Sequence, residues 1–279
     1  EVAKLIEKRI AQADNDPVLI AETGGQNVLV SDSSALPEQV VADVLSSAFD
    51  SAGQRCSALR ILLLQEDVAD HYYKMITEAI NEFSLGDPRL LSTDIGPVID
   101  QEAKQNLENH KANMRKVARA YVELEAPTNG HFVAPAVYLL DNLNQLQREV
   151  FGPILHIVRY KKENLVNVLN EVNAKGYALT GGCHSRIRKQ MDLVEKHLHC
   201  GNFYINRNIV GAVVGVQPFG GHGLSGTGPK AGGEFYLQRL TKTDRYYSQF
   251  GDENTLGNAQ PVLDSITGER NSLAYMPSE

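Results

Sequence analysis

Hydrophobic positions along the chain follow two spacings, one typical of amphipathic helices and one typical of buried strands. Apolar residues three and four positions apart predict a helix over residues 1–13. Short apolar runs predict buried strands at Val18–Ala21, Val28–Val30 and Leu59–Leu64. Strands and helices alternate along the chain, so the pattern predicts an α/β fold with a mostly parallel sheet flanked by helices.

The same spacings predict the remaining elements. Further helices are expected at 38–50, 67–83, 101–118, 163–173 and 186–198, and further strands at 133–140, 154–160, 178–183 and 203–205. Pro135 argues for a sheet edge or a bend, because proline donates no ladder hydrogen bond. Gly201 suits the C-cap of the helix before it. Residues 211–233 indicate a long glycine-rich loop, and 250–279 a tail or extension.

Composition and charge exclude several classes of protein. The 279 residues include 27 basic and 34 acidic side chains, which argues against a nucleic-acid partner. The sequence has no apolar run long enough for a membrane span and no signal-peptide pattern. Its three cysteines form neither a disulfide framework nor a zinc pattern, so we expect no metal, reduced thiols and a cytoplasmic location.

One cysteine, Cys56, lies in a glycine-bearing loop between a predicted helix and a predicted strand. The neighbouring Arg55 and nearby backbone N–H groups favour a low thiol pKa, which would give a reactive thiolate at neutral pH. The alternative is a small buried cysteine with no chemical role. Cys183 and Cys200 lack this setting, and we expect them to be structural.

Two carboxylates also stand in suggestive settings. Glu22 follows an apolar run and precedes two glycines, where partial burial would raise its pKa and suit a general base. The alternative is a solvated glutamate at a strand end. Glu149 and Phe151 precede a Gly-Pro pair and could hold a ribose and a flat ring, or simply form a turn into the next strand.

The glycine-rich stretch contains a formal GxGxxG match at Gly221–Gly226. The strand before it is interrupted and glycines continue where a helix should begin, so the context does not fit a dinucleotide-binding turn. We expect instead a loop whose bare backbone approaches a ligand closely.

Taken together, these segments resemble the aldehyde dehydrogenase superfamily. The matching motifs, in the family's order, are Ala21–Gly25, Gly53–Cys56, Glu149–Pro153 and Pro218–Gly221. The sequences of three segments, Phe49–Ala58, Ser225–Thr227 and Gly232–Gly233, are more specific. They resemble those of the L-glutamate γ-semialdehyde dehydrogenases, also called 1-pyrroline-5-carboxylate dehydrogenases. The dehydrogenase module of bifunctional proline-utilisation enzymes is especially similar.

The resemblance implies a mechanism and a set of roles. Cys56 would attack the aldehyde and form a thiohemiacetal and then a thioester, and Glu22 would activate water to release L-glutamate. NAD would be the oxidant, with Glu149 at its ribose and Phe151 against its nicotinamide. FAD is expected only in a separate domain, if the parent protein is bifunctional. The substrate would be a small amino-acid semialdehyde from proline catabolism, held by Ser57, Phe219, Gly232 and Gly233.

The resemblance also implies how the chain is divided. Residues 1–24 would be a remnant of the NAD-binding domain, 25–225 the catalytic domain, 226–249 a substrate-anchor loop with a return segment, and 250–279 a C-terminal extension. Most of the NAD site would lie upstream, so we expect the chain alone to be inactive and the intact protein to be a homo-oligomer. Peripheral membrane association would come only from other domains. A cysteine hydrolase that needs no NAD and a non-catalytic oligomerisation fragment are the open alternatives.

Overall fold

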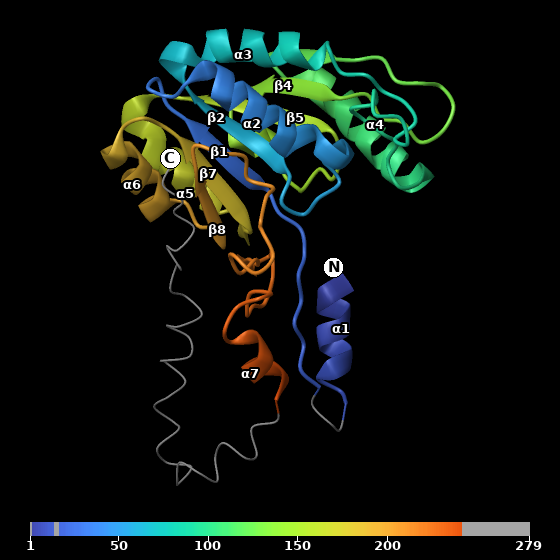
Figure 1. Ribbon diagram of the computed structural model, residues 1–279, viewed down its shortest axis with the longest axis vertical. Helices are drawn as coiled ribbons and strands as arrows, with labels where there is room; N and C mark the ends of the chain where they lie inside the picture. Colours follow the sequence, from blue (N-terminus) through green and yellow to red (C-terminus); the bar gives the residue numbers. More distant parts are fainter. Residues whose placement is uncertain (1, 14–16, 242–279) are drawn as a thin grey trace.

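The structure is a computed structural model and describes residues 2–13 and 17–241. Its centre is a seven-stranded sheet in the order β3-β4-β5-β2-β1-β7-β8 (Figure 1). The strands are β1 (Asn27–Ser31), β2 (Leu59–Gln65), β3 (Ala120–Glu123), β4 (Ala136–Leu140), β5 (Ile154–Tyr160), β7 (Thr180–His184) and β8 (Asn202–Ile205). Only β3 runs antiparallel to its neighbour within this sheet. The predicted α/β fold with a mostly parallel sheet is therefore confirmed.

Helices cover both faces of the sheet. Helices α2 (Pro37–Phe49) and α3 (Glu66–Ile80) pack on one face, and α4 (Gln101–Val117), α5 (Leu165–Asn173) and α6 (Arg188–His197) on the other. Successive strand side chains alternate between the two faces, so Leu29 joins the core under α2 and α3 while Val28 and Val30 join the opposite core. Burial on both faces explains the nearly continuous apolar strands of the sequence.

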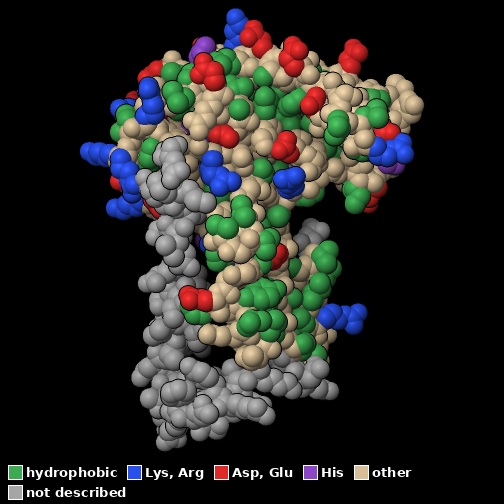
Figure 2. Space-filling model, viewed as in Figure 1, with side chains coloured by type: hydrophobic (Ala, Val, Ile, Leu, Met, Phe, Trp, Pro, Cys, Tyr) green, Lys and Arg blue, Asp and Glu red, His purple; other side chains and the backbone are tan. Residues whose placement is uncertain are grey.

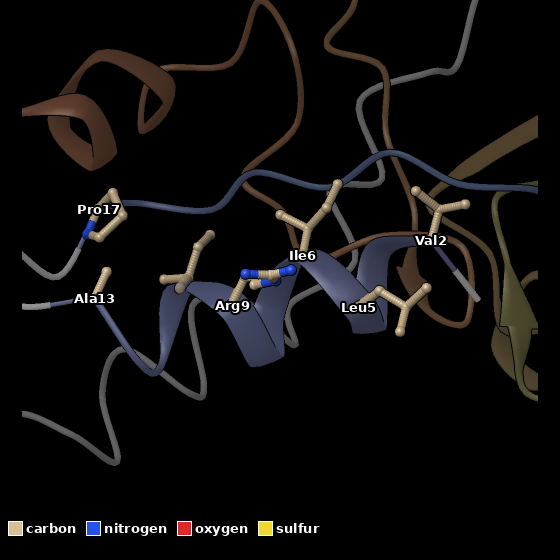
Figure 3. A pocket seen from close by; sticks show the side chains of 7 residues that line it. Val2, Leu5, Ile6, Arg9, Ala13 and Pro17 are labelled. Carbon is tan, nitrogen blue, oxygen red and sulfur yellow. The ribbon is translucent and has the colours of Figure 1, made fainter.

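A smaller part of the molecule lies below the sheet in Figure 1. It contains α1 (Val2–Ile10) and α7 (Tyr236–Leu240). A separate two-stranded pair joins β6 (Tyr177–Ala178) and β9 (His222–Gly223). Helix α1 buries none of its residues. A groove along α1 is lined by Val2, Leu5, Ile6, Arg9, Ile10, Ala13 and Pro17 (Figure 3). In the two described ranges, no helix has the length and apolarity needed to cross a membrane.

Two strand predictions were wrong. Val18–Ala21 is not a buried strand: the segment is extended but partly exposed, and it meets residues 224–227 only through a few backbone contacts. The strand expected at 133–140 begins only at Ala136, because Pro135 cannot join the hydrogen-bond ladder. This strand, β4, is not at the edge, since β3 pairs along its outer side.

The predicted role of Gly201 was also wrong. Helix α6 ends at His197, and its C-cap is Leu198. Gly201 instead permits a close approach between two chain segments, because a Cβ at this position would lie 1.9 Å from the carbonyl oxygen of Gly220. The glycine-rich loop is thus held against the start of β8. The expected extension at 250–279 lies outside the described residues.

Candidate active site

The candidate residues gather at the amino-terminal edge of the parallel strands. Glu22 lies shortly before β1, Cys56 shortly before β2, and the segment Glu149–Gly152 directly before β5. Because these strands are adjacent and parallel, the segments that precede them meet at one edge. Open α/β sheets more often bind ligands at the carboxyl ends of their strands, so this location differs from the usual one.

The loop that carries Cys56 begins with an abrupt change of chain direction after α2. Within η1 (Asp50–Gly53), Ser51 and Ala52 have φ values of 57° and 52°, and Gly53 has a φ of 64°. A left-handed conformation costs a residue other than glycine about 1–3 kcal/mol. Gly53 is needed for a second reason, because a Cβ there would lie 2.2 Å from the carbonyl oxygen of Gly152. The loop is therefore built to press against the segment before β5.

A buried asparagine fixes the backbone on both sides of the thiol. The Nδ2 of Asn27 donates to the carbonyl oxygens of Cys56 at 2.7 Å and Ala58 at 2.8 Å, and its Oδ1 accepts from the N–H of Thr180 at 3.0 Å. Thr180 also donates its hydroxyl to the carbonyl oxygen of Ser57 at 3.1 Å. The sequence analysis missed both residues, although an asparagine at the start of an apolar strand run was a usable signal.

Glu149 is seated by the glycine pair that follows Glu22. Its Oε1 accepts the N–H of Gly25 at 3.0 Å, and a Cβ on Gly24 would lie 1.7 Å from its Oε2. Burial raises the pKa of the Glu149 carboxyl, whereas the Gly25 N–H and the nearby Arg60 oppose that rise. The two sequence motifs around Glu22 and Glu149 are therefore parts of one site.

The thiol of Cys56 lies within electrostatic range of both predicted carboxylates. Burial raises the pKa of this thiol, the N–H groups of Ser57 and Cys56 oppose the rise, and the charges of Glu149 and Glu22 add to it. The structure thus brings Cys56, Glu22 and Glu149 into one cluster. A thiol beside backbone N–H donors and carboxylates suits covalent attack on a carbonyl carbon.

The predicted low pKa of the Cys56 thiol was wrong. Arg55 does not lower the pKa of Cys56: its side chain is exposed, and its Nε donates to the hydroxyl of Ser51 at 3.0 Å. Glu22 is exposed, which agrees with the solvated alternative and not with partial burial, and its segment meets the loop that contains Gly226. Adjacent position in sequence did not determine where the Arg55 side chain points.

The residues predicted to hold the substrate are less tightly gathered. Ser57 is buried, and Phe219 pairs with Ala231 through two backbone hydrogen bonds of 3.0 and 2.8 Å. Gly232 has a φ of 73° with open space beside it, and the N–H of Gly233 donates to Lys230 at 3.0 Å. Among the described residues, no hydrogen bond joins this turn to Ser57. Residues 2–13 and 17–241 also contain no group of histidine, cysteine or acidic side chains suited to a metal ion.

Residues 1–245 match the aldehyde dehydrogenase family, and the chain belongs to this family. The bifunctional protein PutA of Escherichia coli K12 is 54% identical over 252 residues, which are 86% of this chain and 19% of that protein. A 1-pyrroline-5-carboxylate dehydrogenase of Geobacillus is 36% identical over 222 residues, which are 78% of this chain and 43% of that enzyme. The chain therefore spans only part of these relatives.

Solved structures give the same relationship. A crystal structure of bifunctional proline utilization A matches with a TM-score of 0.84 and 54% identity, over 86% of this chain and 24% of that one. A 1-pyrroline-5-carboxylate dehydrogenase from Thermus, solved with bound NAD, matches with a TM-score of 0.77 and 29% identity, over 86% of this chain and 48% of that one. The fold described above is thus the fold of the corresponding part of these enzymes.

Proposed function

We propose that this chain supplies the catalytic residues for the NAD-dependent oxidation of L-glutamate γ-semialdehyde to L-glutamate in proline catabolism. The observation that carries the proposal is the cluster of Cys56, Glu22 and Glu149 at one edge of the sheet. The names of the relatives, PutA and 1-pyrroline-5-carboxylate dehydrogenase, support the substrate class.

The first step is formation of a covalent bond to the substrate. Because the thiol pKa is raised, Cys56 rests as a thiol, and it reacts through the thiolate fraction that forms when its proton passes to solvent. The thiolate attacks the aldehyde carbon and forms a thiohemiacetal. The backbone N–H of Cys56 holds the oxyanion, and the Asn27 hydrogen bonds keep this part of the backbone fixed.

The second step converts the thiohemiacetal to a thioester. NAD, when bound, accepts the hydride that leaves the former aldehyde carbon. The residues present fit part of such a cofactor: the Glu149 carboxylate suits ribose hydroxyls, and the ring of Phe151 is 45% exposed and free to face a flat ligand ring. Glu22 then removes a proton from water, which attacks the thioester, releases L-glutamate and restores Cys56.

The amino-acid head of the substrate needs paired polar groups, because burying unpaired charges is unfavourable. Ser57 supplies a hydroxyl next to the nucleophile. Gly232 and Gly233 supply backbone with no side chain in the way, and Phe219 lines the aliphatic part. The turn at 232–233 must then lie close to Ser57 in the substrate complex.

The proposed division of the chain into domains follows from the same proposed function. Residues 1–24 belong to an NAD-binding domain, 25–225 to the catalytic domain and 226–249 to the substrate-anchor loop and return segment. The open apolar face of α1 supports the first assignment, since an amphipathic helix is stable chiefly when that face is packed. The chain alone is therefore expected to lack dehydrogenase activity.

The test is NADH formation from L-glutamate γ-semialdehyde by the complete gene product that contains this chain. Cys56→Ala should abolish NADH formation, whereas Cys200→Ser should retain it as a matched cysteine control. Ester hydrolysis without NAD, in the absence of NADH formation, would favour a cysteine hydrolase. Absence of both reactions, with no preferential labelling of Cys56 by thiol reagents, would favour a non-catalytic fragment.

A further inference from the structure

A buried arginine, Arg60, stands at the centre of the candidate site. It is the second residue of β2, and none of its side chain is exposed. The rest of β2 is apolar except for its last residue, Gln65. Isolated buried charges are strongly unfavourable, so a buried guanidinium must be held by partners.

The guanidinium joins two loops that are far apart in the sequence. Its Nη2 donates to the carbonyl oxygen of Arg55 at 3.0 Å, directly before Cys56, and its Nη1 donates to the carbonyl oxygen of Gly152 at 3.1 Å. These are the two backbone segments whose close approach also requires Gly53. One rigid, planar group therefore sets the separation of the Cys56 loop from the segment before β5.

The same guanidinium contacts the two predicted cofactor residues. Its Cζ lies 5.3 Å from the centre of the Phe151 ring, within the range of a cation–π contact. Its Nη2 lies 4.0 Å from Oε1 of Glu149. Burial lowers the pKa of Arg60 to about 10, while the charges of Glu149 and Cys56 oppose this shift. Arg60 thus remains the cation at neutral pH.

The backbone of Arg60 is held as well. Its carbonyl oxygen accepts from Nδ1 of His156 at 3.0 Å, and Nε2 of His156 lies 2.9 Å from Nε2 of His110 on α4. With Nδ1 of His156 as a donor, its Nε2 must accept from His110. A chain of hydrogen bonds therefore runs from a helix on the sheet's surface to the arginine.

We propose that Arg60 is a positioning residue that holds the Cys56 loop and the Glu149–Gly152 segment at one fixed separation. This inference rests on the proposed function only where it gives the fixed separation a role in catalysis. Arg60 need not touch substrate, because it acts through Cys56, Glu149 and Phe151. The guanidinium is required for its shape as well as its charge, since a lysine ammonium cannot reach both carbonyl oxygens and lie against the ring.

The experiment uses this 279-residue chain and needs no cofactor. Amide hydrogen exchange is measured at Gln54, Ala58 and Gly152, whose N–H groups are bonded within the two segments. In Arg60→Met and in Arg60→Lys, exchange at these amides should be about tenfold or more faster, the factor for losing one hydrogen bond to a charged group. The pH profile of Cys56 alkylation should shift upward in Arg60→Met and less in Arg60→Lys.

Arg159→Met is the matched control, because Arg159 lies at the other end of the neighbouring strand β5 and pairs with Asp70 at the surface. It should leave exchange at the three amides and the Cys56 profile unchanged. Unchanged exchange in Arg60→Lys, or equal effects from Arg159→Met, would overturn the positioning role. Failure of the gene product to form NADH would refute the proposed function and leave these measurements standing.

Discussion

Gly24 shows how a residue without a side chain acts on a site. A Cβ at position 24 would overlap the Glu149 carboxylate, which lies against the Gly25 N–H. Gly24→Ala should displace that carboxylate and lower NAD-dependent turnover of the gene product by about tenfold or more, the value of one hydrogen bond to a charged group. Steady-state kinetics with varied NAD would measure it.

The control for this substitution is Gly86→Ala, which lies outside the site. A Cβ added there would meet only the hydroxyl oxygen of Thr93 within 4 Å, at 3.3 Å. Its kinetics should match those of the unmodified protein. Equal turnover in Gly24→Ala and the unmodified protein would show that the placement of Glu149 does not matter to the reaction.

Glu22 and Cys56 interact through charge, and this interaction has a definite sign. The negative charge of Glu22 contributes to the raised pKa of the thiol, so its removal favours the thiolate. Glu22→Gln should therefore speed alkylation of Cys56 by a neutral reagent at pH 8. The increase should stay below about fivefold, because Glu22 is exposed and solvent screens its charge.

Mass-spectrometric mapping after brief alkylation would measure this effect site by site. Glu38→Gln removes an exposed glutamate on α2 and serves as the control. Slower alkylation in Glu22→Gln would mean that Glu22 activates the resting thiol more than its charge suppresses the thiolate. In that case the electrostatic account of the cluster is wrong.

At the level of elements, the pair His110 and His156 connects α4 to β5. Burial lowers the pKa of His110 to about 4 and that of His156 to about 3, so both are neutral in the folded chain. In the unfolded chain, these two histidines take up protons as the pH falls through about 6.5. Their contribution to stability is therefore present above pH 6.5 and is lost as the pH falls toward 4.

Urea unfolding of this chain at a series of pH values would measure the loss. Each histidine that stays neutral should contribute a slope of about 1.4 kcal/mol per pH unit in this window. His110→Gln should reduce the slope by that amount, and substitution of the exposed His71 should not. A slope unaffected by His110→Gln would show that this histidine is not held neutral.

The elements also show what sequence patterns could and could not predict. Periodicity located the helices on both faces and the buried strands β1, β2 and β5, because these strands are mostly apolar. It missed β3, whose residues are partly or fully exposed and include Glu123 on a sheet edge. It overrated Val18–Ala21, because an apolar run alone does not say whether partner strands exist.

The site was predictable to a similar extent. Motif order identified Cys56, Glu22 and Glu149, and the structure places these three together. Arg60 and Asn27 were missed because each looks like a polar interruption of an apolar strand. Their importance comes from contacts with carbonyl oxygens distant in the sequence, which no local pattern shows.

The whole molecule has two regions of different character. Figure 2 shows charged side chains spread over the sheet and its helices, while the smaller part below carries many hydrophobic side chains and few charges. In this part, α1 exposes Val2 and Leu5, and α7 exposes Leu237 and Leu240. The chain spans a fifth of its bifunctional relatives, and this uneven surface accords with the proposal that further protein completes the cofactor site.

Trapping the covalent intermediate tests the central claim most directly. If Cys56 is the nucleophile and Glu22 activates water, the Glu22→Gln form of the gene product, given NAD and L-glutamate γ-semialdehyde, should accumulate a thioester. Peptide mass spectrometry should find the glutamyl group on Cys56, and hydroxylamine should remove it. A glutamyl group on Cys200 or Cys183, or undiminished turnover with no acylated cysteine, would contradict the account.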